Sequence, residues 1–132
     1  MFSRQQLEGI LLTLAKPEIH VSRTEDTNIG YRVRLRINFR ASEEFLLMLA
    51  RTFEQKTIKY TYKAEEHKSR PRPILTVGRL ADIWKVCQCV PSNLPDTKNV
   101  WTDFKQIVSL IDNGAHLTLD GLDRILELKG EI

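Results

Sequence analysis

The sequence has few of the residues that build covalent cross-links, metal centres and membrane spans. It contains only two cysteines and three histidines among 132 residues. Cys87 and Cys89 lie two positions apart, which is too close for an ordinary disulfide and matches no zinc-ligand spacing. The longest apolar runs, such as residues 45–50, fall far short of the roughly 18 residues that a transmembrane helix needs. These absences argue against a disulfide scaffold, a zinc domain and a membrane protein.

Several other motifs are also missing. No basic, apolar leader opens the sequence, so we expect an intracellular, reducing location in the cytoplasm, a nucleoid or an organelle matrix. No Walker or Rossmann glycine pattern occurs, and no nucleophile elbow surrounds a serine. His20, His67 and His116 are far apart, which favours surface or capping roles over metal binding. Asp120 and Asp123 complement the dipole of a predicted helix. We therefore expect no cofactor.

Charge is distributed unevenly along the chain. The net charge is +3, and 42% of the residues are apolar, which suits a single domain over residues 1–132 with a real core. Residues 23–72 hold 12 basic and 7 acidic side chains, whereas residues 91–132 hold 4 basic and 7 acidic ones. A basic central segment favours a polyanionic partner. Chance clustering on a solvated surface is the alternative interpretation.

Apolar periodicity and turn residues divide the chain into helices and strands. The predicted order is a helix over 3–15, strands over 18–23 and 31–40, a helix from residue 42, strands over 57–63 and 74–77, and helices over 79–89, 98–112 and 118–129. Ser3, Ser42 and Thr118 can cap three of the helices. The order predicts an α+β fold in which helices cover one face of an antiparallel sheet and leave the other face open.

The strand over 31–40 carries the strongest functional signal. One of its faces is apolar, and the other consists of Arg32, Arg34, Arg36, Asn38 and Arg40. Neighbouring arginines repel each other unless an anion lies against them, and the guanidinium group matches phosphate oxygens and guanine edges. The pattern therefore predicts nucleic-acid binding. Carboxylates on adjacent strands would be the structural alternative.

Further basic and polar residues are expected to support this surface. They lie on the third predicted strand and in the charged loop that follows it. The supporting residues are Lys59, Thr61, Lys63, Arg70 and Arg72. A two-stranded ribbon of this kind fits the major groove of duplex DNA.

Several local patterns together resemble the LAGLIDADG homing endonuclease family. Residues 7–11, Leu-Glu-Gly-Ile-Leu, match the beginning of its signature helix, L-x-G-[LIF]-[IV]. Similar patterns follow in order over 30–35, 46–53, 75–83, 101–111, 116–122 and 125–129. The resemblance implies an αββαββα domain with an antiparallel β-saddle, extra C-terminal helices and a double-stranded DNA partner.

The departure from the family lies at the catalytic position. The eighth residue of the family motif is an Asp or Glu that binds divalent cations, and the corresponding residue here is Leu14. Leucine offers no oxygen to Mg²⁺, which prefers carboxylate and water ligands. The resemblance thus implies no catalytic residue and no metal. Glu8 or Glu18 could replace the missing acid only if the backbone departs from that of the family, and only then would Mg²⁺ be a cofactor.

The resemblance also implies a homodimer, because single-motif members pack their motif helices together on a two-fold axis. Gly9 and Thr13 are four residues apart, a spacing of small residues that allows two helix backbones to approach. The expected interface contains Leu7, Gly9, Ile10, Thr13 and Leu14. The alternative is an ordinary packed helix with an incidental glycine.

The leading hypothesis is therefore a homodimeric DNA-binding protein with an endonuclease-type fold and no cleavage activity. Three alternatives remain: an active homing endonuclease with a displaced acid, an RNA-binding maturase-like protein that uses the same saddle, and an interaction module that binds no nucleic acid.

Overall fold

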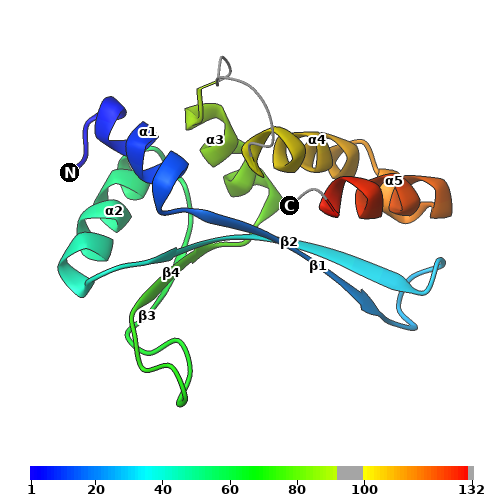
Figure 1. Ribbon diagram of the computed structural model, residues 1–132, viewed down its shortest axis with the longest axis horizontal. Coiled ribbons are helices and arrows are strands. Elements are labelled where there is room, and N and C mark those ends of the chain that lie inside the picture. The colour runs from blue at the N-terminus through cyan, green and yellow to red at the C-terminus, as the bar shows by residue number, and fades with distance from the viewer. Residues whose placement is uncertain (92–99, 131–132) are drawn as a thin grey trace.

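The computed structural model describes residues 1–91 and 100–130, and its helices lie on one side of a curved, four-stranded sheet (Figure 1). The elements are α1 (Arg4–Thr13), β1 (Lys16–Arg23), β2 (Tyr31–Arg40), α2 (Glu43–Gln55), β3 (Thr61–Lys63), β4 (Ile74–Val77), α3 (Leu80–Cys89), α4 (Val100–Asp112), the 3₁₀ turn η1 (Ala115–Leu117) and α5 (Leu119–Lys129). The predicted αββαββα order with extra C-terminal helices is confirmed. Residues 98–99 of the helix predicted over 98–112 lie outside the described residues.

The sheet has the strand order β1-β2-β4-β3, and every neighbouring pair is antiparallel. The long strand β2 lies inside the sheet, paired with β1 from Tyr31 to Asn38 and with β4 from Ile37 to Arg40. Residues opposite each other in an antiparallel ladder share a face. The pairs Ile19–Leu35 and Ile37–Val77 therefore point to the same side, toward the helices.

The core lies between this apolar face and the helices. Ile37, Phe39 and Phe53 are fully buried, and the two phenylalanine rings meet edge to face at 5.6 Å. The indole Nε1 of buried Trp101 donates to the Leu11 carbonyl at 2.7 Å, which ties α4 to α1. Among the described residues, no helix has both the length and the apolar character that a membrane crossing requires.

The three predicted helix caps are confirmed. The Ser3 hydroxyl accepts from the backbone N–H of Gln6, and the Gln6 side chain accepts from the N–H of Ser3, which completes a capping box at α1. Ser42 accepts from the Phe45 N–H at α2, and Thr118 caps α5 in the same way. These caps fix where the chain enters each helix, and the Ser42 cap also fixes where β2 ends.

The third strand is shorter than predicted. The alternation over 57–63 predicts seven strand residues, but β3 contains only Thr61–Lys63. Thr57 has φ of 57°, a left-handed turn that breaks the extended backbone. The Lys59 N–H donates to the carboxylate of buried Asp82 and so takes no part in the sheet ladder. The buried Ile58 side chain explains the apparent alternation, because the turn itself packs against the core.

Candidate nucleic-acid interface

The face of the sheet that points away from the helices is called the outer face (Figure 1). The register of the strands decides which side chains it carries. They are Lys16, Glu18, His20 and Ser22 of β1, Arg32, Arg34, Arg36, Asn38 and Arg40 of β2, Ile74 and Thr76 of β4, and Thr61 and Lys63 of β3. The predicted row of β2 side chains is therefore on the open side of the sheet.

Two arginines of this row are free. Arg34 and Arg36 are exposed, and neither forms an ion pair with any carboxylate of the described residues. Arg36 lies opposite Glu18 in the ladder, but the carboxylate of Glu18 bonds elsewhere. Two unneutralised guanidinium groups, two residues apart on one face, create a local positive potential that attracts phosphate.

The two arginines at the ends of the row have acidic partners. Arg32 Nη2 lies 3.1 Å from Asp26 Oδ2 in the β1–β2 turn. Arg40 donates from Nε and Nη2 to the two carboxylate oxygens of Glu66, at 2.7 and 3.0 Å. The structural alternative raised by the sequence thus holds at these two positions, although the carboxylates belong to connecting segments rather than to adjacent strands.

Asn38 takes part in a hydrogen-bond network on the outer face. Its Nδ2 donates to Glu18 Oε2 at 2.8 Å, and its Oδ1 accepts from the Thr76 hydroxyl at 2.8 Å. Only 6% of Asn38 is exposed. The network joins β1, β2 and β4 across the sheet, and the predicted role of Asn38 in nucleic-acid contact would require it to break.

A hollow of about 860 Å³ lies on the outer face beside β2, β3 and β4. It brings together seven of the ten predicted binding residues: Arg36, Asn38, Arg40, Lys59, Thr61, Lys63 and Arg70. Arg32, Arg34 and Arg72 lie outside it. Lys59 reaches the hollow from the turn before β3 rather than from the strand.

The sequence interpretation overlooked two polar residues of this surface, Glu66 and Thr76, and considered Glu18 only as a displaced acid. Thr76 could have been found, because alternation in β4 places it on the outer face. Glu66 had no such signal, because it lies in a loop whose path only the folded chain defines. The Arg40 guanidinium lowers the pKa of Glu66 to about 2, with further lowering by Arg72 and Arg70, so the carboxylate stays ionised at neutral pH.

A second surface lies along the exposed side of α1. An open, mostly apolar groove of about 580 Å³ is lined there by Phe2, Gln6, Gly9, Ile10, Thr13, Leu14, Ala41 and Phe45. Four of the five predicted interface residues therefore meet in one groove. The fifth, Leu7, is 2% exposed and points into the core of its own chain.

Gly9 has no packing reason within the described part of its own chain. A Cβ atom added at this position would meet nothing within 4 Å among the described residues, apart from its chain neighbours and the backbone of its own helix. A glycine inside a helix costs about 1 kcal/mol relative to alanine, and no close packing of the described residues against Gly9 offsets that cost. The Thr13 hydroxyl donates to the Gly9 carbonyl at 2.6 Å, which satisfies the hydroxyl within the helix.

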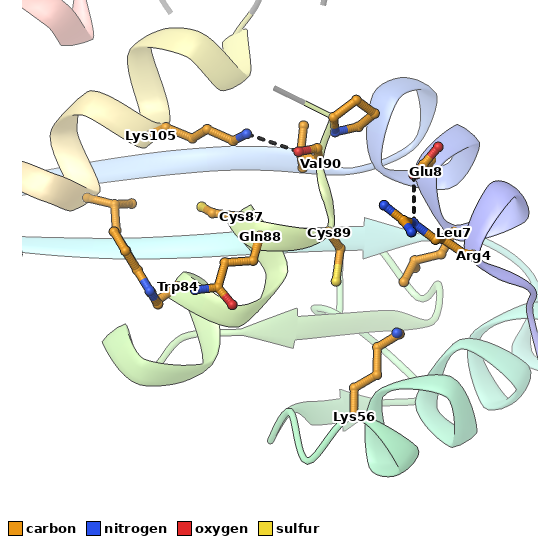
Figure 2. A pocket seen from close by; sticks show the side chains of 12 residues that line it. Arg4, Leu7, Glu8, Lys56, Trp84, Cys87, Gln88, Cys89, Val90 and Lys105 are labelled. Carbon is orange, nitrogen blue, oxygen red and sulfur yellow. Dashed lines mark hydrogen bonds and ion pairs between the residues drawn. The ribbon is translucent and has the colours of Figure 1, made fainter. Parts of the chain in front are cut away.

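The carboxylate of Glu8 lies on the helical side of the sheet. It lies 3.3 Å from Arg4 Nε and lines a hollow of about 620 Å³. Figure 2 shows this ion pair, with Trp84, Cys87 and Lys105 among the other side chains around the hollow. Burial raises the pKa of the Cys87 thiol to about 12, which keeps it protonated and unreactive. This region is therefore separate from the outer face.

The side chains at the signature position do not fit a divalent cation. Leu14 is a half-buried hydrocarbon at the C-terminal end of α1 and supplies no oxygen. Within residues 1–91 and 100–130, no three side chains of His, Cys, Asp or Glu gather in a way that could hold a metal ion.

Comparison with known proteins finds solved structures with a similar fold. No protein-family model matches the chain, and no curated protein matches it in sequence. The homing endonuclease I-TnaI is similar in structure, with a TM-score of 0.84, 20% identity and 99% of this chain and 88% of that one covered. The meganuclease I-SmaMI bound to uncleaveable DNA gives a TM-score of 0.83, 18% identity and coverage of 98% and 44%.

A third structure extends the comparison. The I-LtrWI LAGLIDADG homing endonuclease bound to target DNA gives a TM-score of 0.80 at 20% identity, with 99% of this chain and 44% of that chain covered. The chain thus spans most of I-TnaI but less than half the length of I-SmaMI and I-LtrWI. Because the similarity extends over 98–99% of this chain at TM-scores of 0.80–0.84, the chain has the fold of the LAGLIDADG homing endonucleases.

Proposed function

We propose that this protein is a homodimeric, sequence-specific DNA-binding protein that does not cleave its target. The observation that carries the proposal is the outer face, where Arg34 and Arg36 have no acidic partner among the described residues and Arg36 lines a polar and basic hollow. The DNA-bound states of I-SmaMI and I-LtrWI support a duplex ligand for a sheet of this fold.

The proposed binding is electrostatic in part and therefore depends on salt. If the dimer neutralises about six phosphates, the logarithm of the association constant falls with the logarithm of salt concentration at a slope near −5. Fluorescence anisotropy with a labelled duplex over a salt series measures this slope. An RNA competitor of equal length identifies the maturase-like alternative, and binding that does not respond to salt contradicts the proposal.

The dimer is proposed to form through the α1 groove. A second copy would cover the open apolar groove, and the bare backbone at Gly9 would let the two helices approach closely. We also propose that the second copy takes the place of the part of I-SmaMI and I-LtrWI that this chain does not cover.

A bulky side chain at Gly9 tests the dimer. Gly9→Leu places new atoms where two backbones meet, and overpacking of this kind costs about 1–3 kcal/mol. We expect roughly 5- to 150-fold weaker association in sedimentation velocity. The free energy of unfolding of the single chain should stay the same or rise slightly, because the added Cβ meets no side chain of the described residues. Gln106→Leu places the same side chain at an exposed position of α4, outside the groove, and should leave association unchanged. A wild-type chain that is monomeric at tens of micromolar, with and without duplex, contradicts the dimer.

Absence of cleavage is the third part of the proposal. The bound duplex should remain intact with Mg²⁺ or Mn²⁺, because Leu14 offers no metal ligand. Glu18 is the one displaced acid that the structure favours as a rival, since its side chain is 34% exposed on the outer face with Oε2 3.4 Å from His20 Nε2. Specific double-strand breaks that disappear in Glu18→Gln but persist in Glu8→Gln would replace the proposed function with an active nuclease.

A further inference from the structure

The β3–β4 loop (residues 64–73) is closed by its own backbone. The N–H of Glu66 donates to the Arg72 carbonyl at 2.9 Å, and His67 and Arg70 exchange N–H to carbonyl bonds at 3.2 and 2.9 Å. The His67 ring also bonds with the hydroxyl of Ser69 at 2.7 Å. These bonds shape the tip of the loop but do not fix its direction relative to the sheet.

One side chain of this loop reaches the neighbouring strand. Glu66 accepts both hydrogen bonds of Arg40 on β2, and its Oε1 also lies 3.6 Å from Arg72 Nε. The two groups of the bidentate pair are largely covered, with 17% of the Glu66 side chain and 21% of the Arg40 side chain exposed. The ladder between β3 and β4 ends at Lys63 and Ile74, and beyond it this pair supplies the hydrogen bonds between the loop and β2 among the described residues.

The charges around the pair show what its removal would do. Arg40, Arg70 and Arg72 all act on the Glu66 carboxylate, and Lys63 lines the same hollow as Arg40 and Arg70. Without the carboxylate these cations would repel one another, and the loop would leave the sheet. A flexible basic loop still attracts phosphate, but it no longer presents its side chains in one geometry.

We infer that Glu66 is a positioning residue that holds the β3–β4 loop and the Arg40 guanidinium in the arrangement needed to discriminate between duplex sequences. This inference rests on the proposed DNA-binding function. Glu66 itself does not touch the duplex; it acts through Arg40 and Arg72. Its carboxylate lowers the general attraction for DNA, but the loop that it fixes distinguishes target from non-target.

The test compares Glu66→Gln with Glu65→Gln. Both variants remove one negative charge from the same loop, but Glu65 is exposed and, within the described part of the chain, forms no hydrogen bond or ion pair. The probes are a duplex selected by the wild-type protein from a randomised pool and a scrambled duplex of the same composition. We expect Glu66→Gln to lower the ratio of the two affinities about tenfold or more, as for the loss of a bidentate contact. Glu65→Gln should leave the ratio unchanged and strengthen both affinities slightly.

Hydrogen exchange separates this inference from the proposed function. In Glu66→Gln, the amides of Glu66, His67, Arg70 and Arg72 should exchange faster than in the wild type and in Glu65→Gln, while the core amides remain protected. If the wild type binds no duplex, the proposed function is wrong. The hydrogen-exchange rates of the loop amides then still test whether Glu66 holds the loop in place. Equal exchange and equal affinity ratios in the two variants would overturn the inference.

Discussion

The Arg34→Ala/Arg36→Ala variant should bind duplex DNA on the order of 100-fold more weakly than the wild type at physiological salt. These guanidinium groups are the two of the β2 row that have no acidic partner in the described structure, so all of their charge is available to phosphate. In a dimer the variant loses four such groups. The salt dependence should therefore become shallower by roughly 3–4 in slope, at about 0.9 for each phosphate contact.

A matched control has the same change in net charge. Arg51 on α2 and Lys129 on α5 are exposed on helices, away from the outer face. Arg51→Ala/Lys129→Ala should keep nearly the full salt slope and lose little affinity. If both double variants weaken binding equally, the attraction comes from net charge alone, and the assignment of the outer face is wrong.

Much of the fold could be predicted because local signals agree with tertiary structure. The period-two alternation of residues 31–40 gives β2 its observed bounds, since a strand with one apolar face has a single way to lie on a core. The capping serines and Thr118 mark helix starts through short-range hydrogen bonds. The length of β3 is overestimated from the sequence, because the apolar Ile58 belongs to a turn and not to the strand. Its side chain packs against the core, and the N–H groups of the turn bond to α2 and α3.

The candidate site could be predicted only in part. Which β2 residues share a face follows from sequence alone, but which arginines are neutralised does not. Glu66 lies 26 residues from Arg40 and Asp26 lies six residues from Arg32, and both pairings depend on the path of a connecting segment. The hydrogen bonds of the Asn38 side chain within the sheet likewise depend on strand register, which brings Glu18 and Thr76 to its two sides.

The sequence also does not show which residues of α1 are available for an interface. Leu7 and Leu14 are seven residues apart and lie near one another on a helical projection. Only the packed chain reveals that Leu7 is buried against its own core whereas Leu14 lines the open groove. Leu14 is thus the apolar residue of the motif that a second copy could cover without disturbing the fold.

Leu14→Asp should weaken the dimer more than any other single substitution considered. Burial of a leucine contributes about 1.5–3 kcal/mol. Each protomer of the symmetric dimer would lose one buried leucine, so the dissociation constant should rise roughly 100-fold or more. Two aspartates at the axis would also repel each other. In addition, Leu14 is the C-terminal cap of α1, where the helix dipole disfavours a negative charge.

Sedimentation velocity over a concentration series measures this loss, with Leu14→Met as the control of similar volume and polarity. Added Mg²⁺ should restore part of the association of Leu14→Asp, because paired carboxylates are good ligands for this ion, and should leave the wild type unchanged. Undiminished association of Leu14→Asp would place Leu14 outside the interface. Restoration by Mg²⁺ in the variant alone would show that the substitution at this position replaces a metal-binding pair with an apolar contact, so that one change removes the ligand for catalysis and strengthens the dimer.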